Sequence, residues 1–382
     1  MWTLIRGIRQ LLTLRGPSGP RRGPAAGVLD AIPHCAILLR NGIVERMGKA
    51  RGVESAREAR DAHVLEIGGG LVMPALVEPD ALIAPAGIDL PRKKRETETI
   101  RGSTERARYG YLAAGVHSAD AQDFREVVKI LRALQNAQLR PLRLRPVLDL
   151  PFPEPGGDNR ALMAKVLGKW LPAVQKRRLA AVVEIVIHDG GSPIAEDDAQ
   201  KLVEAAAGWG FALRFRSIAP LKEPLPHFAV AAGAMAVIAP LDGDGAAAAL
   251  GGSAVQVVPC AGLLDAAPNG LARIARGRGI ALALSSGYSS VEPASLNPQL
   301  LLHLAVHRLG MTQEEAITAM TWNAACSLRM SNSAGCIDVG RPADLVAVDV
   351  EDYSEMIRRA GSNDLKMTMR GGRVIYSRAG VE

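Results

Sequence analysis

The chain has 382 residues, 48% of them hydrophobic and 22% charged, with 39 glycines and 24 prolines spread along it. This composition is typical of a packed globular protein of two to three domains, or of one large barrel with an appendage, and it excludes a small peptide module and wholesale disorder. The net charge is only +7 and aromatic residues make up 4%, so we expect no nucleic-acid partner, because such partners select basic patches with stacking rings.

The cysteines and the N-terminal segment indicate in which cellular compartment the protein is expected. Four cysteines without CxxC spacing are far too few for a disulfide-stapled secreted domain, so we interpret them as buried thiols in a reducing, cytoplasmic setting. Residues Met1 to Leu12 are basic and apolar, but they lack a continuous apolar core and a small-residue cleavage pattern. We therefore favour a first β-strand over a targeting peptide. No later apolar stretch reaches the roughly 18 residues of a membrane span, and we expect no membrane association.

The two ends of the chain predict β-hairpins. Asn41-Gly42 joins two apolar runs near the N-terminus, and Gly371-Gly372 joins two more near the C-terminus. Such dipeptides tolerate the positive φ angles of a tight hairpin turn. Because isolated hairpins are marginal in water, we expect both ends to pair into one small, sandwich-like β-domain of residues 1–71 and 335–382.

The middle of the chain, residues 72–334, alternates short apolar runs with longer amphipathic ones. We count eight predicted strands, the number that a closed β/α barrel requires. A capping box at Thr312 and Glu315 predicts the start of a helix. The polar segment from Asp89 to Glu105, which contains Arg92-Lys93-Lys94-Arg95, predicts a solvated loop instead. The predicted strands are Leu76–Val77, Gly115–Ala119, Pro146–Leu150, Ala181–Ile187, Phe211–Phe215, Met235–Ala239, Ala254–Val258 and Ile280–Leu284.

Three segments carry a family resemblance in the right order and at fitting separations. Residues 335–346, GCIDVGRPADLV, resemble the G-x-I-x-x-G-x-x-A-D-L segment of the amidohydrolase superfamily. Residues 321–325, TWNAA, and 72–79, VMPALVEP, are similar to its T-x-N-A-A and V-x-P-G-x-V-D motifs. Within the superfamily, the chain is most similar to imidazolonepropionases, the cyclic-amide hydrolases of histidine breakdown. The resemblance covers nearly the whole chain, and it implies an α/β protein with a (β/α)8 TIM barrel of the amidohydrolase type plus the small β-domain.

The family's chemistry needs a divalent cation held by side-chain donors at the barrel rim. By resemblance, Asp80 and Leu82 stand where the family has H-x-H, and Arg216 stands at its His after the fifth strand. Arginine has no free lone pair, and a guanidinium at about 5 Å from a divalent ion costs about 6 kcal/mol at an effective dielectric near 20. We therefore expect no metal and no other cofactor. The remaining matched positions, which lack donor side chains, are Ala219, Ala239 and Gly287.

A replacement site at the same rim is the open question. His117 and His188 fall at or near the ends of predicted strands two and four. His188 and the adjacent Asp189, together with Asp80 and Arg216, could form a polar mouth for a small anionic ligand near Arg216. The alternative is that both histidines are ordinary solvent-facing rim residues. His303 and His307 are four apart on one predicted helix, and a surface pair explains them better than a zinc site does.

These observations lead to one hypothesis and one alternative. The hypothesis is an imidazolonepropionase-like protein that has lost metal-dependent cyclic-amide hydrolysis. Its role would be that of a non-catalytic subunit, a scaffold or a ligand binder, with a protein partner or a second copy of itself. The alternative is a metal-independent hydrolase or lyase for a small anionic or cyclic-amide substrate, with Asp80, His117 or His188 as acid or base.

Overall fold

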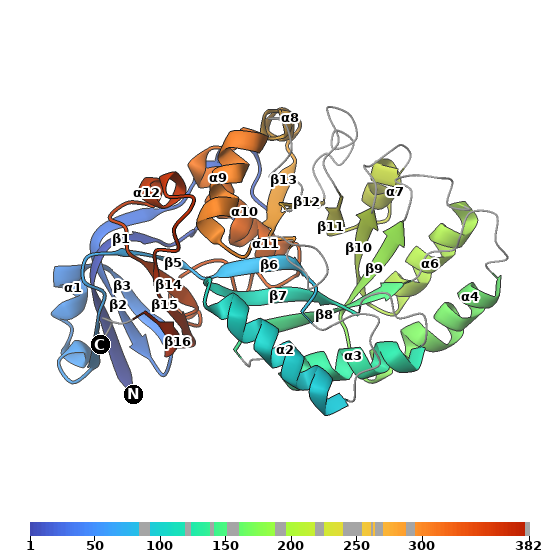
Figure 1. Ribbon diagram of the computed structural model, residues 1–382, viewed down its shortest axis with the longest axis horizontal. Coiled ribbons are helices and arrows are strands. Elements are labelled where there is room, and N and C mark those ends of the chain that lie inside the picture. The colour runs from blue at the N-terminus through green and yellow to red at the C-terminus, as the bar shows by residue number, and fades with distance from the viewer. Residues whose placement is uncertain are drawn as a thin grey trace.

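Two separate β-sheets organise the molecule, one from the middle of the chain and one from its two ends (Figure 1). The computed structural model describes residues 1–83, 92–118, 124–137, 141–150, 160–187, 196–217, 225–239, 254–260, 263, 270–287 and 295–378. The predicted α/β fold, an eight-stranded parallel barrel plus a small β-domain made from both ends, is confirmed.

The barrel sheet runs in chain order, and each neighbouring pair of its strands is parallel. All eight predicted strands are present. Side-chain bonds link the first strand to the last: Ser285 Oγ donates to the Asp80 carbonyl at 3.2 Å, and the Ser286 N–H donates to the Glu78 carboxylate at 3.1 Å. The barrel is therefore nearly closed. Its strands are β6 (Leu76–Ala81), β7 (Tyr111–His117), β8 (Arg143–Leu150), β9 (Val182–Ile187), β10 (Ala212–Ser217), β11 (Ala236–Ile238), β12 (Val255–Pro259) and β13 (Ala281–Ser285).

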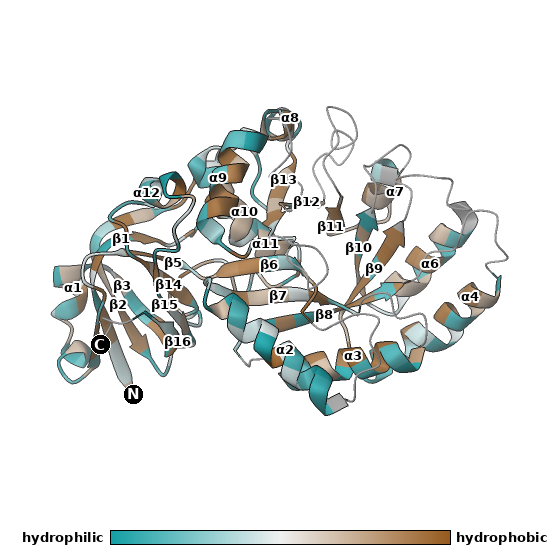
Figure 2. Ribbon diagram, viewed as in Figure 1, coloured by the Kyte–Doolittle hydropathy of each residue, from teal (hydrophilic) through white to brown (hydrophobic). Residues whose placement is uncertain are grey.

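Helices follow most barrel strands, and Figure 2 shows hydrophobic residues concentrated in the strands while the helices alternate hydrophobic and hydrophilic residues. The predicted capping box of Thr312 and Glu315 is present at the start of α10. Within the described parts of the chain, no helix has both the length and the apolar character to cross a bilayer. The barrel helices are α2 (Arg92–Ala107), α3 (Phe124–Ala137), α4 (Arg160–Lys165), α5 (Leu171–Lys176), α6 (Glu196–Gly208), α7 (Leu225–Ala231), α8 (Leu271–Arg278), α9 (Pro298–Leu309), α10 (Gln313–Met320) and α11 (Trp322–Cys326), with a π-helical turn at Val166–Trp170 between α4 and α5.

The expectation of a solvated loop over 89–105 is wrong for the part that the structure describes, because α2 begins at Arg92. Hydrophobic periodicity missed this helix because its buried stripe is polar. Arg95, Thr99, Ser103 and Arg106 recur about every four residues, and all four are buried. The Arg95 guanidinium pairs with Glu126 of α3, so the charge that predicted exposure is instead used in helix packing.

The second sheet contains strands from both chain ends and confirms both predicted hairpins. Its order is β16-β15-β14-β5-β1-β2-β3, and β4 pairs with β1. The two hairpin turns touch each other: a Cβ atom added to Gly42, whose φ is +80°, would lie 2.0 Å from the Gly371 carbonyl oxygen. The strands are β1 (Trp2–Leu12), β2 (Ala31–Arg40), β3 (Ile43–Lys49), β4 (His63–Glu66), β5 (Leu71–Pro74), β14 (Leu345–Val348), β15 (Leu365–Arg370) and β16 (Arg373–Ser377). The short helices of the two chain ends are η1 (Gly23–Gly27), which packs against α8 and α10, and α1 (Ala50–Glu54), η2 (Arg57–Ala59) and α12 (Tyr353–Arg358).

The barrel interior changes in character along its strands. Near the strand starts it is filled by small apolar side chains such as Ala236, Val255 and Ala281, and α11 with the turn after it closes this end through Ala324 and Leu328. Toward the strand ends the same interior carries buried charges. The carboxyl ends of the strands, where barrel proteins place their sites, are therefore the polar end of this barrel, which we call the mouth.

Gly115 on β7 tests how tightly the closed end is packed. A Cβ atom there would lie 2.4 Å from Leu328 Cδ2 and 2.8 Å from the Pro79 carbonyl oxygen, whereas one at Gly277 in α8 would meet nothing within 4 Å. We expect Gly115→Ala to lower the free energy of unfolding by about 1 to 3 kcal/mol in urea titrations. Gly277→Ala is the control and should be neutral or slightly stabilising, since alanine favours helix. Equal effects from the two variants would contradict this packing.

Candidate functional site

Five neighbouring barrel strands, β6 to β10, bring charged side chains into one cluster inside the barrel. Residues two apart on a strand share a face, so the i and i+2 positions of these strands both point to the interior. The cluster consists of Glu78 and Asp80 on β6, His117 on β7, Asp149 on β8, Glu184 on β9, and Arg214 and Arg216 on β10. Sequence analysis placed Asp80, His117 and Arg216 separately at the barrel rim, and the structure brings the three side chains together.

The Arg216 guanidinium lies at the centre of the cluster. Its Nε donates to Glu184 Oε1 at 2.6 Å, and its Nη2 donates to Asp80 Oδ1. The Glu184 side chain is completely buried and that of Asp80 is 9% exposed, while Arg216 is 24% exposed. One guanidinium thus bridges two carboxylates from strands that lie on opposite sides of β7 and β8.

His117 is part of the same network. Its Nε2 contacts Asp80 Oδ1, and its Nδ1 lies 3.1 Å from Asp149 Oδ1 and 3.2 Å from Glu184 Oε1. The His117 side chain is only 7% exposed, so the expectation of a solvent-facing rim residue is wrong for this histidine. Three carboxylates surround the ring, and the Arg216 Nη2 lies 2.6 Å from its Nε2.

Charge matching sets the protonation states. Burial raises the pKa of Asp80, but the charges of Arg216 and His117 outweigh burial and hold that pKa well below its ordinary value. Burial and Arg216 lower the pKa of His117, and the carboxylates of Glu184, Asp149 and Asp80 outweigh both, so its pKa lies well above the ordinary value. The three carboxylates therefore favour the protonated form of the ring. Burial also lowers the pKa of Arg216, but its carboxylate partners Asp80 and Glu184 raise it by more, so this pKa lies above its ordinary value.

Arg214 also pairs with Glu184, from the side nearer the strand starts. Its Nε and Nη2 lie 3.0 and 2.9 Å from Glu184 Oε2, and its Nη1 donates to the Pro79 carbonyl at 2.8 Å. Both oxygens of Glu184 therefore face guanidinium groups. With His117 protonated, three cationic groups, Arg214, Arg216 and His117, face the three carboxylates of Asp80, Asp149 and Glu184. The cluster is close to neutral as a whole.

Glu78 has a separate environment, because it closes the barrel seam. Its carboxylate accepts the Ser286 backbone N–H, and burial raises its pKa more than that bond and the charge of Arg106 lower it. This residue joins β6 to the end of β13, where a strand ladder is missing.

The donor set does not fit a divalent cation at the positions that the family resemblance indicates. Leu82 is half-buried, Ala239 is buried and Gly287 is half-buried, and none of the three has a donor side chain. Ala219 and His188 lie outside the described residues. Among the described residues, the ligand atoms of His117, Asp149 and Glu184 do lie within 4.8 Å of one another. However, both Glu184 oxygens face guanidinium groups, and a dication placed there would lie beside a fixed positive charge.

Sequence analysis missed Glu78, Asp149, Glu184 and Arg214. A signal was present: each is a charged residue inside a run that otherwise reads as a buried barrel strand, as Glu184 does in VVEIVI. Parallel strands buried on both faces are nearly all apolar, so a charge within one marks either a site or an ion pair. The signal could have found these residues, but it could not have shown which of them meet.

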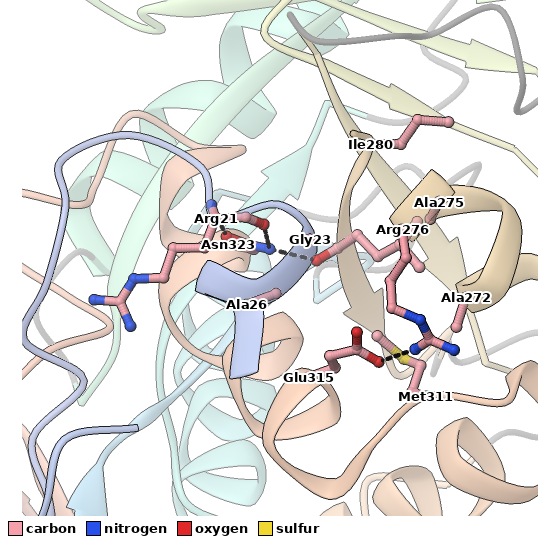
Figure 3. Close-up of a pocket in the computed structure, with 11 residues that line it drawn as sticks. Arg21, Gly23, Ala26, Ala272, Ala275, Arg276, Ile280, Met311, Glu315 and Asn323 are labelled. Carbon is pink, nitrogen blue, oxygen red and sulfur yellow. Dashed lines mark hydrogen bonds and ion pairs between the residues drawn. The ribbon is translucent and has the colours of Figure 1, made fainter. Parts of the chain in front are cut away.

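Two other features lie away from the mouth. His303 and His307 share α9 with their rings 4.2 Å apart, as a helical pair should. A small hollow lies between η1, α8 and α10, beside the ion pair of Arg276 with Glu315 at 2.6 Å (Figure 3). The Arg21 guanidinium points away from this hollow and donates to the carbonyl oxygens of Leu14 and Val28. The hollow therefore offers a ligand little polar chemistry.

Comparisons with known proteins agree with this architecture. The model of the amidohydrolase family matches residues 285–375. An imidazolonepropionase from Solibacter usitatus is 28% identical over 97% of this chain and 98% of its own, and one from Deinococcus radiodurans is 26% identical over 94% and 96%. Among solved structures, Escherichia coli guanine deaminase superposes with a TM-score of 0.66 at 14% identity over 99% of this chain and 100% of its own, and Aspergillus niger ochratoxinase with 0.68 at 16% identity over 99% and 96%.

The parallel barrel, the sheet built from both chain ends and these structural likenesses define a barrel protein of the amidohydrolase fold. The matched family segment contains the 335–346 motif that connects barrel and end sheet. The chain is therefore similar to proteins of the amidohydrolase superfamily, and within that superfamily it is imidazolonepropionase-like.

The central ion pair makes a testable contribution to stability. Replacing Arg216 by methionine leaves the Asp80 and Glu184 carboxylates buried with less compensation, so we expect a loss of about 3 kcal/mol or more in the free energy of unfolding at pH 7. Arg6, whose pair with Glu66 is about half exposed, provides the control. Its methionine variant should change stability by less than about 1 kcal/mol. Urea titration of both variants measures the difference, and an unchanged Arg216→Met midpoint would contradict the network.

The raised pKa of His117 predicts a particular pH dependence. The ring binds its proton more tightly in the folded state, so its stabilising contribution is complete below the unfolded pKa of about 6.5 and is lost as pH rises through the folded value. The stability difference between the wild type and His117→Gln should therefore be largest near pH 6 and shrink toward alkaline pH. Urea titrations across pH 6 to 10 test this, and a difference that grows with pH would show that His117 is buried neutral.

Proposed function

We propose that this imidazolonepropionase-like chain does not carry out metal-dependent hydrolysis of a cyclic amide, and that it acts as a non-catalytic subunit, scaffold or ligand-binding protein in the cytoplasm. The observation that carries the proposal is the placement of Arg216. By family resemblance this residue stands where a metal-binding histidine is expected, and its guanidinium instead bridges Asp80 and Glu184.

The physical argument is one of charge. In a metal-dependent hydrolase the cation neutralises the carboxylates around it, lowers the pKa of a bound water and polarises the carbonyl to be attacked. Arg216 and protonated His117 already neutralise the carboxylates of this mouth, and neither offers a lone pair to a metal. A guanidinium also cannot generate hydroxide from water. The residues that remain thus support charge balance rather than activation of a nucleophile.

The scaffold is maintained while the mouth is changed, which favours a role for the surface or the pocket. The 335–346 segment that joins the barrel to the end sheet keeps the family pattern, and its Asp344 is bonded to Arg143 and to the Gly371 N–H. A protein partner or a second copy of the chain is the occupant we propose for such a surface. The small anionic ligand expected near Arg216 stays a prediction, and it would compete with Asp80 and Glu184 for the guanidinium.

One observation favours the alternative, a metal-independent hydrolase or lyase. His117 contacts Asp80 on one side and Asp149 on the other, which is a hydrogen-bonded arrangement that an acid or base could use. The alternative requires that His117 exchange its proton near neutral pH. The carboxylates around it hold its pKa well above its ordinary value and so disfavour that exchange, which leaves the first proposal the better supported one.

Metal content and turnover test the proposal together. The wild type, purified without chelator, should contain far less than one equivalent of zinc or iron by elemental analysis and should not hydrolyse imidazolonepropionate. A variant that restores the family's donors, combining Asp80→His, Leu82→His, Arg216→His and Gly287→Asp, should bind close to one equivalent of zinc.

Two outcomes would overturn the proposal. One equivalent of metal in the wild type would show that other side chains hold a cation. Hydrolysis by the metal-free wild type that His117→Gln abolishes would favour the alternative enzyme. Retained folding of each variant is checked by circular dichroism, so that a loss of binding is not mistaken for unfolding.

A further inference from the structure

A second concentration of charge lies at the opposite end of the barrel from the mouth. Arg143 and Arg145 occupy the start of β8, and Arg329 follows α11, which closes this end. Arg370 and Arg373 flank the turn between β15 and β16, beside the same edge of the barrel. Alternation along β8 places Arg143 and Arg145 on one face, with Arg329 close to Arg145 and with Arg370 close to Arg143 and Arg373.

The described residues supply one carboxylate to this arginine cluster. Asp344 accepts from Arg143 Nε at 2.6 Å and from the Gly371 N–H at 2.8 Å. Arg370 donates to the Pro141 carbonyl at 2.8 Å. Burial lowers the pKa of Arg370, Asp344 opposes that shift, and the neighbouring charges of Arg143 and Arg373 add to it. Asp344 therefore lies among the charges of Arg143, Arg370 and Arg373 on this side of the cluster.

Within the arginine cluster, the charge and N–H donors of Arg145 have few partners in the protein. It donates from Nη2 to the Arg329 carbonyl at 3.3 Å, and its Nε is buried without a hydrogen-bond partner. Burial and the nearby Arg329 charge both lower its pKa, and no carboxylate opposes them. No carboxylate among the described residues lies within ion-pair distance of Arg145 or Arg329. A buried donor and an unmatched charge are costly unless a partner supplies the missing acceptor.

The backbone at Arg329 is also unusual. Its φ is +52°, in the left-handed region that favours glycine. The adjacent turn is fixed by bonds from the Met330 and Ser333 N–H groups to Ala325 and Met330. An arginine is thus held in a conformation that glycine would adopt more easily, and its charge is placed next to Arg145.

We propose that the arginine cluster, Arg143, Arg145, Arg329, Arg370 and Arg373, binds a small multivalent oxyanion of the phosphoryl type. Guanidinium groups present paired N–H donors that match phosphate oxygens, and several of them together favour a multiply charged anion over a chloride or a single carboxylate. The buried position of Arg145 Nε favours a small group over a folded macromolecule. This site is separate from the mouth, so the proposal does not depend on whether the chain is an enzyme.

Pyrophosphate is a suitable probe, used with the full chain at constant ionic strength balanced with sodium chloride. We expect saturable binding by calorimetry and a rise in the thermal unfolding midpoint, with inorganic phosphate binding more weakly. Arg145→Gln should raise the dissociation constant about tenfold. Arg329→Gly should also weaken binding, yet unfold at no lower temperature than the wild type without ligand, because glycine fits the backbone there. Arg46→Gln, an exposed arginine on β3, is the matched control and should leave affinity unchanged.

Several results would overturn the proposal. These are the absence of saturable binding to the wild type at balanced ionic strength, an unchanged affinity in Arg145→Gln, or equal weakening by Arg46→Gln, which would indicate attraction to the net charge alone. Binding of an acidic peptide or an RNA oligonucleotide to these arginines without any binding of pyrophosphate would replace the small anion with a macromolecular partner. None of these results bears on metal content or turnover at the mouth.

Discussion

The contact on which the barrel mouth depends is the bridge from Arg216 to Asp80 and Glu184. Three carboxylates from β6, β8 and β9 converge inside a water-poor barrel, and their mutual repulsion would oppose closure of the sheet. The guanidinium and the protonated ring of His117 remove that repulsion, and each hydrogen bond that they make also joins two strands. A buried ionic cluster of this kind is stable only when every member has a partner, which explains why burial and neighbouring charge compete so strongly at each of its groups.

The seam between β13 and β6 depends on different chemistry. Glu78 accepts the Ser286 N–H, and Ser285 reaches the Asp80 carbonyl, so side chains take the place of a strand ladder there. Below the charged layer, the small apolar residues around Ala236 and Ala281 fill the barrel independently of the mouth. The fold therefore requires that the buried charges of the mouth balance one another, but it does not require a particular set of side chains there. This separation means that side chains at the mouth can differ without disturbing the apolar layer below them.

Local signals accounted for most of the fold. The turn dipeptides at Asn41-Gly42 and Gly371-Gly372, the eight apolar runs and the Thr312 capping box each depend on near neighbours in the chain, and the structure contains all of them. The signals failed where packing between distant segments decides the outcome. The polar stripe of α2 is buried because Glu126 of α3 receives Arg95, and no pattern within α2 contains that information. At the mouth, alignment could mark Asp80 and Arg216, but the partnership with Glu184 depends on strand register.

The two ends of the barrel use arginine in opposite ways. At the mouth every guanidinium lies within hydrogen-bond distance of a carboxylate from a neighbouring strand, so the cluster satisfies itself and leaves no unbalanced charge for a ligand. At the other end no described carboxylate lies within ion-pair distance of Arg145 or Arg329, and Arg145 has a buried donor without an acceptor. Electrostatic attraction of a ligand requires charge that the protein has not already neutralised. On that criterion the closed end of the barrel, rather than the mouth, is the better place for an anion to bind.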